Sequence, residues 1–303
     1  MTIALSNLFI IAIMIAGFQK LLKNNFYIIL ANLICFTSLK AFVECAFVVP
    51  YYVIQRDGAR MMGYFTLTYE WTFFNLSVFA DYGVLFFSLL IALNRYFSMI
   101  RQSGVIDKQR METCASCLVV WICAAIIPVL FFLCQCQYSF DAIVGTKMYY
   151  NDCAYGLSPI VRCLLLCIVY LSYAVALLVL CVYVRTFMLY HRKKHNAKNL
   201  SRSYFRQDII QFNLLKQSAV IFVLYASSIL CVFILSFVKI NPNGFSEIAF
   251  AENLLNLSIA GIYPICFLCM SSELRRVLVV KIRPSAPGRV ASISVHTPNV
   301  PRA

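Results

Sequence analysis

Three charged residues lie inside long apolar runs of the sequence, where an ionised side chain is costly and usually functional. Lys40 and Glu44 stand four residues apart in one run, so they face each other on a helix. Lys40 lies 15 residues after Asn25, and Asp81, in the next run, lies 14 before Arg95. At 1.5 Å per residue both sit about 21–22 Å from the same side of a bundle. The predicted Lys40–Asp81–Glu44 cluster either lines the floor of a ligand cavity or is a structural pairing that neutralises three charges.

A polar stripe accompanies the second run. It has intervals of four, seven and seven residues and consists of Ser77, Asp81, Ser88 and Arg95. Residues at these intervals share one face of a helix, and lipid does not favour such a face, so it should point into a bundle. Ser77, Asp81 and Tyr82 are therefore the predicted ligand contacts on this helix.

No metal cluster, nucleotide-binding loop or nucleophile–base arrangement stands out in the sequence. His191 and His195 have i,i+4 spacing, but they lie in a basic stretch, where such a pair is more often a solvated helix face than a metal site. We expect no enzyme, no catalytic residue, no metal ion and no cofactor.

The elements that position these residues are predicted to be membrane helices. The sequence is 62% hydrophobic and 13% charged, far from the roughly half apolar and quarter charged mixture of soluble domains. A soluble core of 303 residues could not hide so much apolar surface, whereas lipid solvates it. The net charge of +14 is spread over short segments between the apolar runs, which argues against a nucleic-acid partner.

Seven apolar windows approach the roughly 20 residues that a spanning helix needs. They are residues 2–18, 26–54, 71–100, 113–134, 160–189, 218–238 and 248–270. The first is short, and a signal peptide is its alternative reading, but a signal peptide carries basic residues before its apolar run, whereas Lys20 and Lys23 follow this one. The predicted fold is an all-α membrane protein with a seven-transmembrane helix bundle.

Two further segments follow the seventh window. Residues 271–280 mix basic and apolar residues, which is typical of a short interfacial eighth helix. Residues 284–303 are rich in Pro, Ser, Gly and Arg, and we expect a disordered tail. The chain therefore divides into one membrane domain that includes the eighth helix, 1–283, and the disordered tail, 284–303.

Lysine and arginine set the orientation of the helices. With the N-terminus outside and the C-terminus in the cytoplasm, 20 basic residues fall on the cytoplasmic side and five on the outer side. The longest basic loop, residues 191–206, suits both contact with anionic membrane lipids and docking of an intracellular partner. The glycosylation pattern at Asn199-Leu200-Ser201 then falls inside the cell and should not be used.

Several short motifs are distributed over nearly the whole chain. The triplet Asn94-Arg95-Tyr96 ends the third predicted helix, and Tyr263-Pro264-Ile265-Cys266-Phe267 lies in the seventh window. The other segments are Ala31-Asn32, Val48-Val49-Pro50, Trp121 with Pro128, Phe212 to Gln217, and Glu273-Leu274-Arg275. The types and order of these segments resemble those of rhodopsin-like G-protein-coupled receptors, and of nematode serpentine chemoreceptors, class X especially. Residues 263–267 stand where that family has Asn-Pro-x-x-Tyr.

This resemblance implies a small-molecule or peptide ligand in the outer half of the bundle and a heterotrimeric G protein at the inner face. It implies a plasma-membrane location, with sensory cilia as the site for a chemoreceptor. Asn94, Arg95 and Tyr96 would form the cytoplasmic switch. The helix-seven switch would consist of Tyr263, Pro264 and Phe267. Asn94 stands where the family has an acid, so the usual local Arg–carboxylate restraint is missing.

Cys136 and Cys153 fall in the loop before residue 160, which faces the oxidising exterior in this orientation. A bridge between them would stabilise the fold by about 3 kcal/mol in the chain-entropy model. Many receptors of the resembled family instead tether this loop to a cysteine 25 residues before the arginine, and that position is Glu70 here. We predict a Cys136–Cys153 disulfide, with two free thiols as the alternative.

The leading function is therefore a chemosensory receptor. A transporter or channel is the rival, in which Lys40, Glu44 and Asp81 would line a translocation path, although neither internal repeats nor broken helices are evident in the sequence. A receptor-derived chain that no longer signals is a third reading, because the first helix is short and the motifs are altered.

Overall fold

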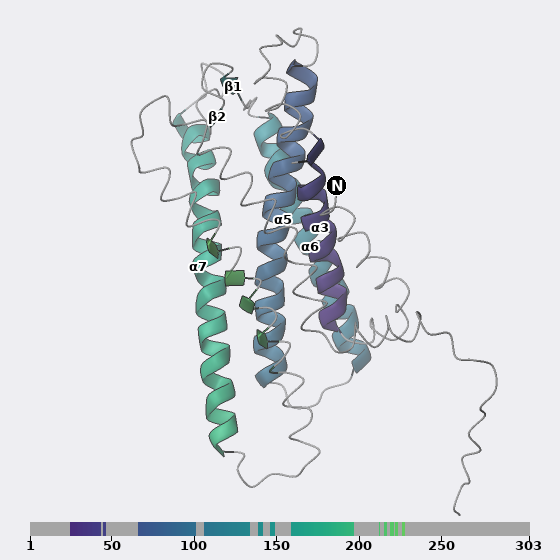
Figure 1. The fold of residues 1–303 in the computed structure, drawn as a ribbon, viewed down its shortest axis with the longest axis vertical. Helices are drawn as coiled ribbons and strands as arrows, with labels where there is room; N and C mark the ends of the chain where they lie inside the picture. The colour runs from purple at the N-terminus through teal and green to yellow at the C-terminus, as the bar shows by residue number, and fades with distance from the viewer. Residues whose placement is uncertain are drawn as a thin grey trace, which may run out of the picture.

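The computed structural model describes four long helices, one hairpin and part of a further helical segment (Figure 1). The helices are α3 (Asn25–Val43), α5 (Thr66–Ile100), α6 (Ile106–Leu133) and α7 (Pro159–Asn196), and the strands are β1 (Ser139–Asp141) and β2 (Thr146–Met148). The described residues also include 45–46 and the helical positions Phe212, Leu215, Lys216, Ala219, Val220, Phe222, Val223, Ala226 and Ser227. Each of the four helices holds a segment long and apolar enough to cross a membrane.

Three of the seven predicted windows are confirmed as helices, those at 71–100, 113–134 and 160–189. The window at 26–54 is confirmed up to Val43, where α3 ends, and residues 47–54 lie outside the described residues. The window at 218–238 is described only in part, and helical positions near it already begin at Phe212. The windows at 2–18 and 248–270, the eighth helix and the tail lie outside the described residues. The count of seven and the orientation stay predictions.

The helices extend beyond the windows that hydropathy marked. α6 begins at Ile106 rather than at residue 113, and α7 continues to Asn196 rather than ending at residue 189. Hydropathy reports the stretch of a helix that suits lipid, whereas backbone hydrogen bonding continues into water. Arg110 and Arg192, which were expected in loops, therefore lie on helices. Pro159 opens α7, because proline has no N–H to lose at the first helical position.

A short β-hairpin lies between α6 and α7, while every long described element is a helix, as the predicted all-α fold requires. β1 and β2 pair antiparallel, with Ser139 opposite Met148 and Asp141 opposite Thr146. Only four residues separate the strands, so β1 and β2 form a local hairpin. Hydropathy windows of helical length cannot detect strands of three residues.

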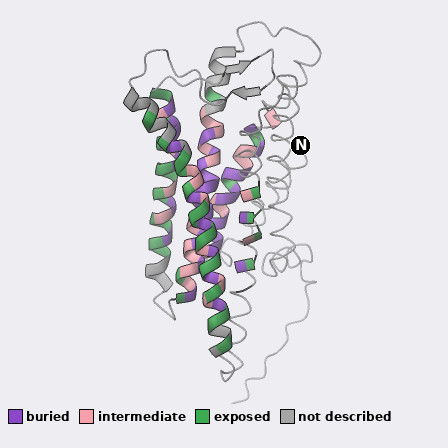
Figure 2. Ribbon diagram, turned by 90° about the vertical axis from the view of Figure 1, so that its left-hand side faces the viewer, coloured by how far each residue is buried: buried purple, intermediate pink, exposed green. Residues whose placement is uncertain are grey.

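α5 is the central helix of the described bundle. It packs against α3, α6 and α7, and α3 also packs against α6. Within their apolar windows, 56% of the residues of α3 and α5 are buried, against 28% for α6 and α7. Figure 2 shows the corresponding exposed residues along the outer helices. Because the exposed residues of α6 and α7 are largely apolar, these two helices present a surface that suits lipid.

Contacts at two levels fix the directions of the helices. Phe26 and Lys40 lie 14 residues apart on α3, and their partners on α5, Arg95 and Asp81, are also 14 apart in the reverse order. α3 and α5 are therefore antiparallel.

α7 runs parallel to α5. Tyr82 of α5 contacts Ile168 of α7, and further along both helices Tyr96 of α5 contacts Arg185 of α7. Because residue numbers rise together from one contact to the next, α5 and α7 point in the same direction.

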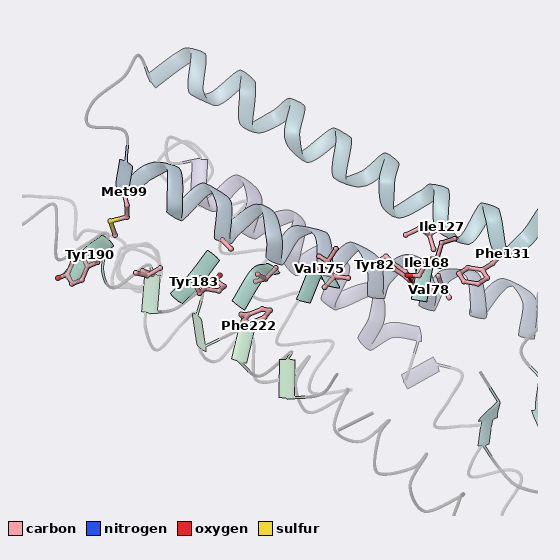
Figure 3. Close-up of a cluster of buried hydrophobic side chains, with 14 residues drawn as sticks. Val78, Tyr82, Met99, Ile127, Phe131, Ile168, Val175, Tyr183, Tyr190 and Phe222 are labelled. Carbon is pink, nitrogen blue, oxygen red and sulfur yellow. Dashed lines mark hydrogen bonds between the residues drawn. The ribbon is translucent and has the colours of Figure 1, made fainter. Parts of the chain in front are cut away.

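Two groups of buried apolar side chains hold these helices together. The first lies between α3, α5 and α6 and includes Phe36, Phe87 and Ala124. The second follows α5 and α7 from Val78 to Tyr190 and also takes in Phe222 of the partly described helical segment (Figure 3). Together they leave α5 surrounded by apolar contacts, so the polar side chains that it carries inside the bundle must find partners there.

Candidate functional site

The first part of the candidate site, nearer the side predicted to be extracellular, is an ion pair between two helices. Lys40 Nζ, in the last turn of α3, donates to Asp81 Oδ1 of α5. The Lys40 side chain is 13% exposed and that of Asp81 is 41% exposed, so the carboxylate is the more accessible partner. The structure thus joins the two residues whose depths match in the sequence. Glu44 lies outside the described residues, so only this pair of the predicted cluster can be placed.

Ser77 and Tyr82, the other predicted ligand contacts, have different surroundings. Ser77 is partly buried one helical turn before Asp81. Tyr82 is buried and points toward α7, where its hydroxyl donates to the backbone carbonyl of Ile168 at 3.2 Å. Its hydroxyl thus joins α5 to α7. A role for either side chain in binding a ligand stays a prediction.

Below the ion pair, α3 and α5 approach each other at Gly83. A Cβ atom at this position would overlap the Phe36 ring of α3. That ring is confined by Trp121 of α6, with ring centroids 4.3 Å apart, and by Phe79 of α5 at 5.0 Å. Glycine is therefore required by the close approach of the two helices.

A polar contact reinforces the same level of the bundle. Trp121 Nε1 donates to Asn32 Oδ1 at 2.8 Å, and Asn32 Nδ2 donates to the Ile28 carbonyl at 2.8 Å. The amide of Asn32 thus joins α3 to α6 while its other end is satisfied within its own helix. The sequence reasoning did not identify this contact, although a lone asparagine in the apolar run of α3 was a signal for it.

The second part of the site, called inner because the predicted orientation places it nearer the cytoplasm, centres on Arg95. Its residue exposure is only 2%, and its guanidinium carbon lies 4.3 Å from the centre of the Phe26 ring at the start of α3. Arg95 Nη2 donates to Asn94 Oδ1 at 3.2 Å. The described contacts of Arg95 thus include an aromatic face and a neutral amide.

Tyr96, the third member of the predicted switch, contacts α7. The Arg185 guanidinium carbon lies 5.7 Å from the centre of the Tyr96 ring, a cation–π contact between the inner ends of α5 and α7. The predicted switch residues thus reach two helices, since Arg95 meets α3 and Tyr96 meets α7.

The helical positions between 212 and 227 lie against the inner half of α7. Tyr190 stacks on Phe212 with centroids 4.3 Å apart and planes at 12°, and Tyr183 packs on Phe222 at 5.6 Å. Residue numbers rise along one partner as they fall along the other, so this segment is antiparallel to α7. Lys216 Nζ lies 4.6 Å from the centre of the Phe212 ring, and this contact extends the aromatic stack.

The remaining predicted site residues cannot be placed. Tyr263, Pro264 and Phe267, and likewise Cys136 and Cys153, lie outside the described residues. Among the residues that the structure does describe, no three His, Cys, Asp or Glu side chains come together to hold a metal ion. The described interactions of the candidate site residues on α5 therefore include an ion pair and cation–π contacts.

Comparison with known proteins adds no assignment. No family model matches the chain, and no curated protein matches it significantly.

Proposed function

We propose that the chain is a chemosensory G-protein-coupled receptor of the plasma membrane, with seven transmembrane helices. It binds a small-molecule or peptide ligand in the outer half of the bundle and activates a heterotrimeric G protein at the cytoplasmic face. The observation that carries this proposal is the arrangement on α5. An accessible ion pair at Asp81 and a buried arginine at Arg95 lie on one helix, about 21 Å apart at 1.5 Å per residue.

The Lys40–Asp81 ion pair is a contact between α3 and α5 that a bound ligand could alter. A ligand that binds the carboxylate of Asp81 competes with Lys40 for it and so alters the contact between α3 and α5. A ligand shifts a conformational equilibrium only through contacts that differ between the two states. We propose that the Lys40–Asp81 contact is of this kind, because it joins two different helices.

Arg95 and Tyr96 would respond to such a shift, because they contact the helices on either side of α5. Arg95 contacts α3 through Phe26, while Tyr96 contacts α7 through Arg185. A displacement of α5 relative to either helix changes which groups the two cations meet. A buried carboxylate would restrain the arginine more strongly than the aromatic and amide contacts, because it would place a full negative charge beside the cation in a low-dielectric interior. We propose that the G protein engages the bundle at this end.

The proposed orientation predicts where an introduced glycan is added. Val144→Asn creates the pattern Asn-Gly-Thr between β1 and β2, in a loop proposed to face the exterior. We expect the variant expressed in animal cells to gain one glycan, seen as a mass shift that a glycosidase removes. The native pattern at Asn199, proposed to be cytoplasmic, should carry none, so Asn199→Gln should not change the mass. Glycosylation at Asn199 and not at position 144 would mean that the bundle is inverted.

The proposed signalling predicts the effect of removing the inner cation. Cells that express the chain and a reporter G protein would be screened with fractionated small molecules and peptides for a calcium response. Any response that the unchanged chain gives should be at least tenfold weaker in Arg95→Ala, when the two chains are present at the cell surface in equal amounts. Arg110→Gln, an exposed cation on α6, is the control for loss of charge and should respond normally.

Two outcomes would contradict this proposal. A response that persists in Arg95→Ala would remove the arginine from the switch. Ligand-driven uptake or current that survives in cells lacking the G protein would favour a transporter or channel that uses the Lys40–Asp81 pair.

A further inference from the structure

The inner half of α7 carries a hollow that combines apolar and cationic residues. Its volume is about 540 Å³, within the 300–1,000 Å³ typical of ligand sites. The residues that line it are Leu180, Cys181, Val184, Arg185, Met188, Leu189 and Arg192. Five of the seven are apolar, two are arginines, and none of these described lining residues is acidic.

These residues are arranged in order along the helix. The arginines lie seven residues apart, which places them on one face, and Arg192 ends the apolar window of α7, at 170–192. Lys193 and Lys194 follow at once. Leu180, Val184 and Met188 are exposed and lie on the side of Arg192 that is nearer the middle of the window. The charged end of the hollow is therefore at the end of the span, and its apolar end is deeper.

The length of the hollow matches one leaflet of a bilayer. Leu180 and Arg192 are 12 residues apart, or about 18 Å along a helix. Half of the hydrocarbon core of a membrane is about 15 Å thick. A phospholipid with its phosphate at Arg192 would therefore lay an acyl chain along Met188, Val184 and Leu180.

Arg185 lies deeper in the span than Arg192, but it is partly held in place. Its guanidinium lies over the Tyr96 ring, and a cation–π contact leaves the N–H donors of an arginine free to bind oxygen atoms. A long side chain at this depth reaches toward the interface with its charged end. Both arginines line the hollow, Arg192 at its charged end and Arg185 about 10 Å deeper along the helix axis.

We propose that this face of α7, defined by the seven lining residues, binds an anionic phospholipid. Two arginines without an acidic neighbour among the lining residues favour a headgroup with net negative charge over a zwitterionic one. In the proposed orientation the site faces the cytoplasmic leaflet, which is the leaflet that carries anionic lipids. The proposal requires α7 to span a membrane but does not require the chain to signal.

Native mass spectrometry of the purified full chain tests this assignment. Phosphatidylserine and phosphatidylcholine with identical acyl chains are titrated separately, and the bound fraction is measured. We expect tighter binding of phosphatidylserine. Removal of one interfacial cation in Arg192→Gln should weaken it about fivefold. Arg185→Gln/Arg192→Gln should remove the preference, and Arg192→Lys should retain most of it. Arg110→Gln, an equal loss of charge from α6, should have no effect.

A second pair of variants tests the hollow without changing charge. Met188→Trp fills it, whereas Leu118→Trp adds the same bulk to α6 at a residue of similar exposure, 62% against 59%. Only Met188→Trp should reduce phosphatidylserine binding. Equal binding of the two lipids, or equal losses in Arg192→Gln and Arg110→Gln, would overturn the proposal. If the purified chain is a dimer, and Met188→Trp makes it monomeric without changing lipid binding, the face would belong to a second copy of the chain instead.

Discussion

Asp81→Leu is expected to reduce the amount of chain at the cell surface severalfold, and Lys40→Met/Asp81→Leu to restore most of it. The single change leaves Lys40, which is 13% exposed, without its ion-pair partner. An unpaired charge at the centre of a spanning helix costs about 2.5–3.5 kcal/mol, and because Lys40 lies in the last turn of α3, the expected loss is about 2 kcal/mol. Removing both charges also removes that cost, since an apolar pair is often as stable as an ion pair. Surface biotinylation measures the outcome.

Two further variants test whether the effect depends on the Lys40–Asp81 pair. The charge swap Lys40→Asp/Asp81→Lys should also regain surface expression, because it keeps one charge of each sign across the same helices. Arg110→Gln, which removes a charge from the exposed surface of α6, should express normally. If the double variants are no better than Asp81→Leu, the two side chains do not depend on each other, and the pairing between α3 and α5 has no energetic role.

Gly83→Ala is expected to lower the stability of the purified chain by about 2 kcal/mol, although alanine is the better helix former. In water the change from glycine to alanine in a helix gains about 1 kcal/mol. Here the new methyl group overlaps Phe36, and overpacking typically costs 1–3 kcal/mol or more. Phe36 cannot yield easily, since its ring also contacts Phe79 and Trp121. Thermal unfolding followed by tryptophan fluorescence should show a lower Tm.

A double variant distinguishes this clash from other causes. Phe36→Leu removes ring atoms that the new methyl group would meet, so Gly83→Ala should cost less in a Phe36→Leu background than in the unchanged chain. Additive losses in the double variant, or a higher Tm for Gly83→Ala alone, would mean that α3 and α5 are not in close contact at this level.

The existence of α3, α5, α6 and α7 could be predicted from hydropathy because each contains about 20 apolar residues. Their ends could not. α6 begins seven residues early and α7 ends seven residues late, since charged residues such as Arg110 and Arg192 are good helix formers once they reach water. The hairpin at 139–148 was missed because strands of three residues leave no hydropathy signal.

The Lys40–Asp81 contact could be predicted because depth along two antiparallel helices depends only on residue number. Contacts that depend on rotation about the helix axis could not be predicted in this way. Whether Asn32 faces Trp121, or Gly83 faces Phe36, is decided by how three helices pack together. The lone glycine in the middle of α5 signalled a close approach but not which side chain would fill it. Likewise, the arginine of the Asn94-Arg95-Tyr96 triplet could be placed at the inner end, but its contact with Phe26 could not.

The most direct test of the receptor proposal needs no ligand. Membranes that contain the chain are mixed with purified heterotrimeric G proteins, and nucleotide exchange is measured for the unchanged chain, Arg95→Ala and Asn94→Asp at equal amounts. An aspartate at position 94 would strengthen the present 3.2 Å contact between residues 94 and 95 by adding charge. We predict exchange above background for the unchanged chain, lower exchange for Asn94→Asp, and background exchange for Arg95→Ala. Exchange at background for the unchanged chain with every class of G protein, or equal exchange in all three, would contradict the account.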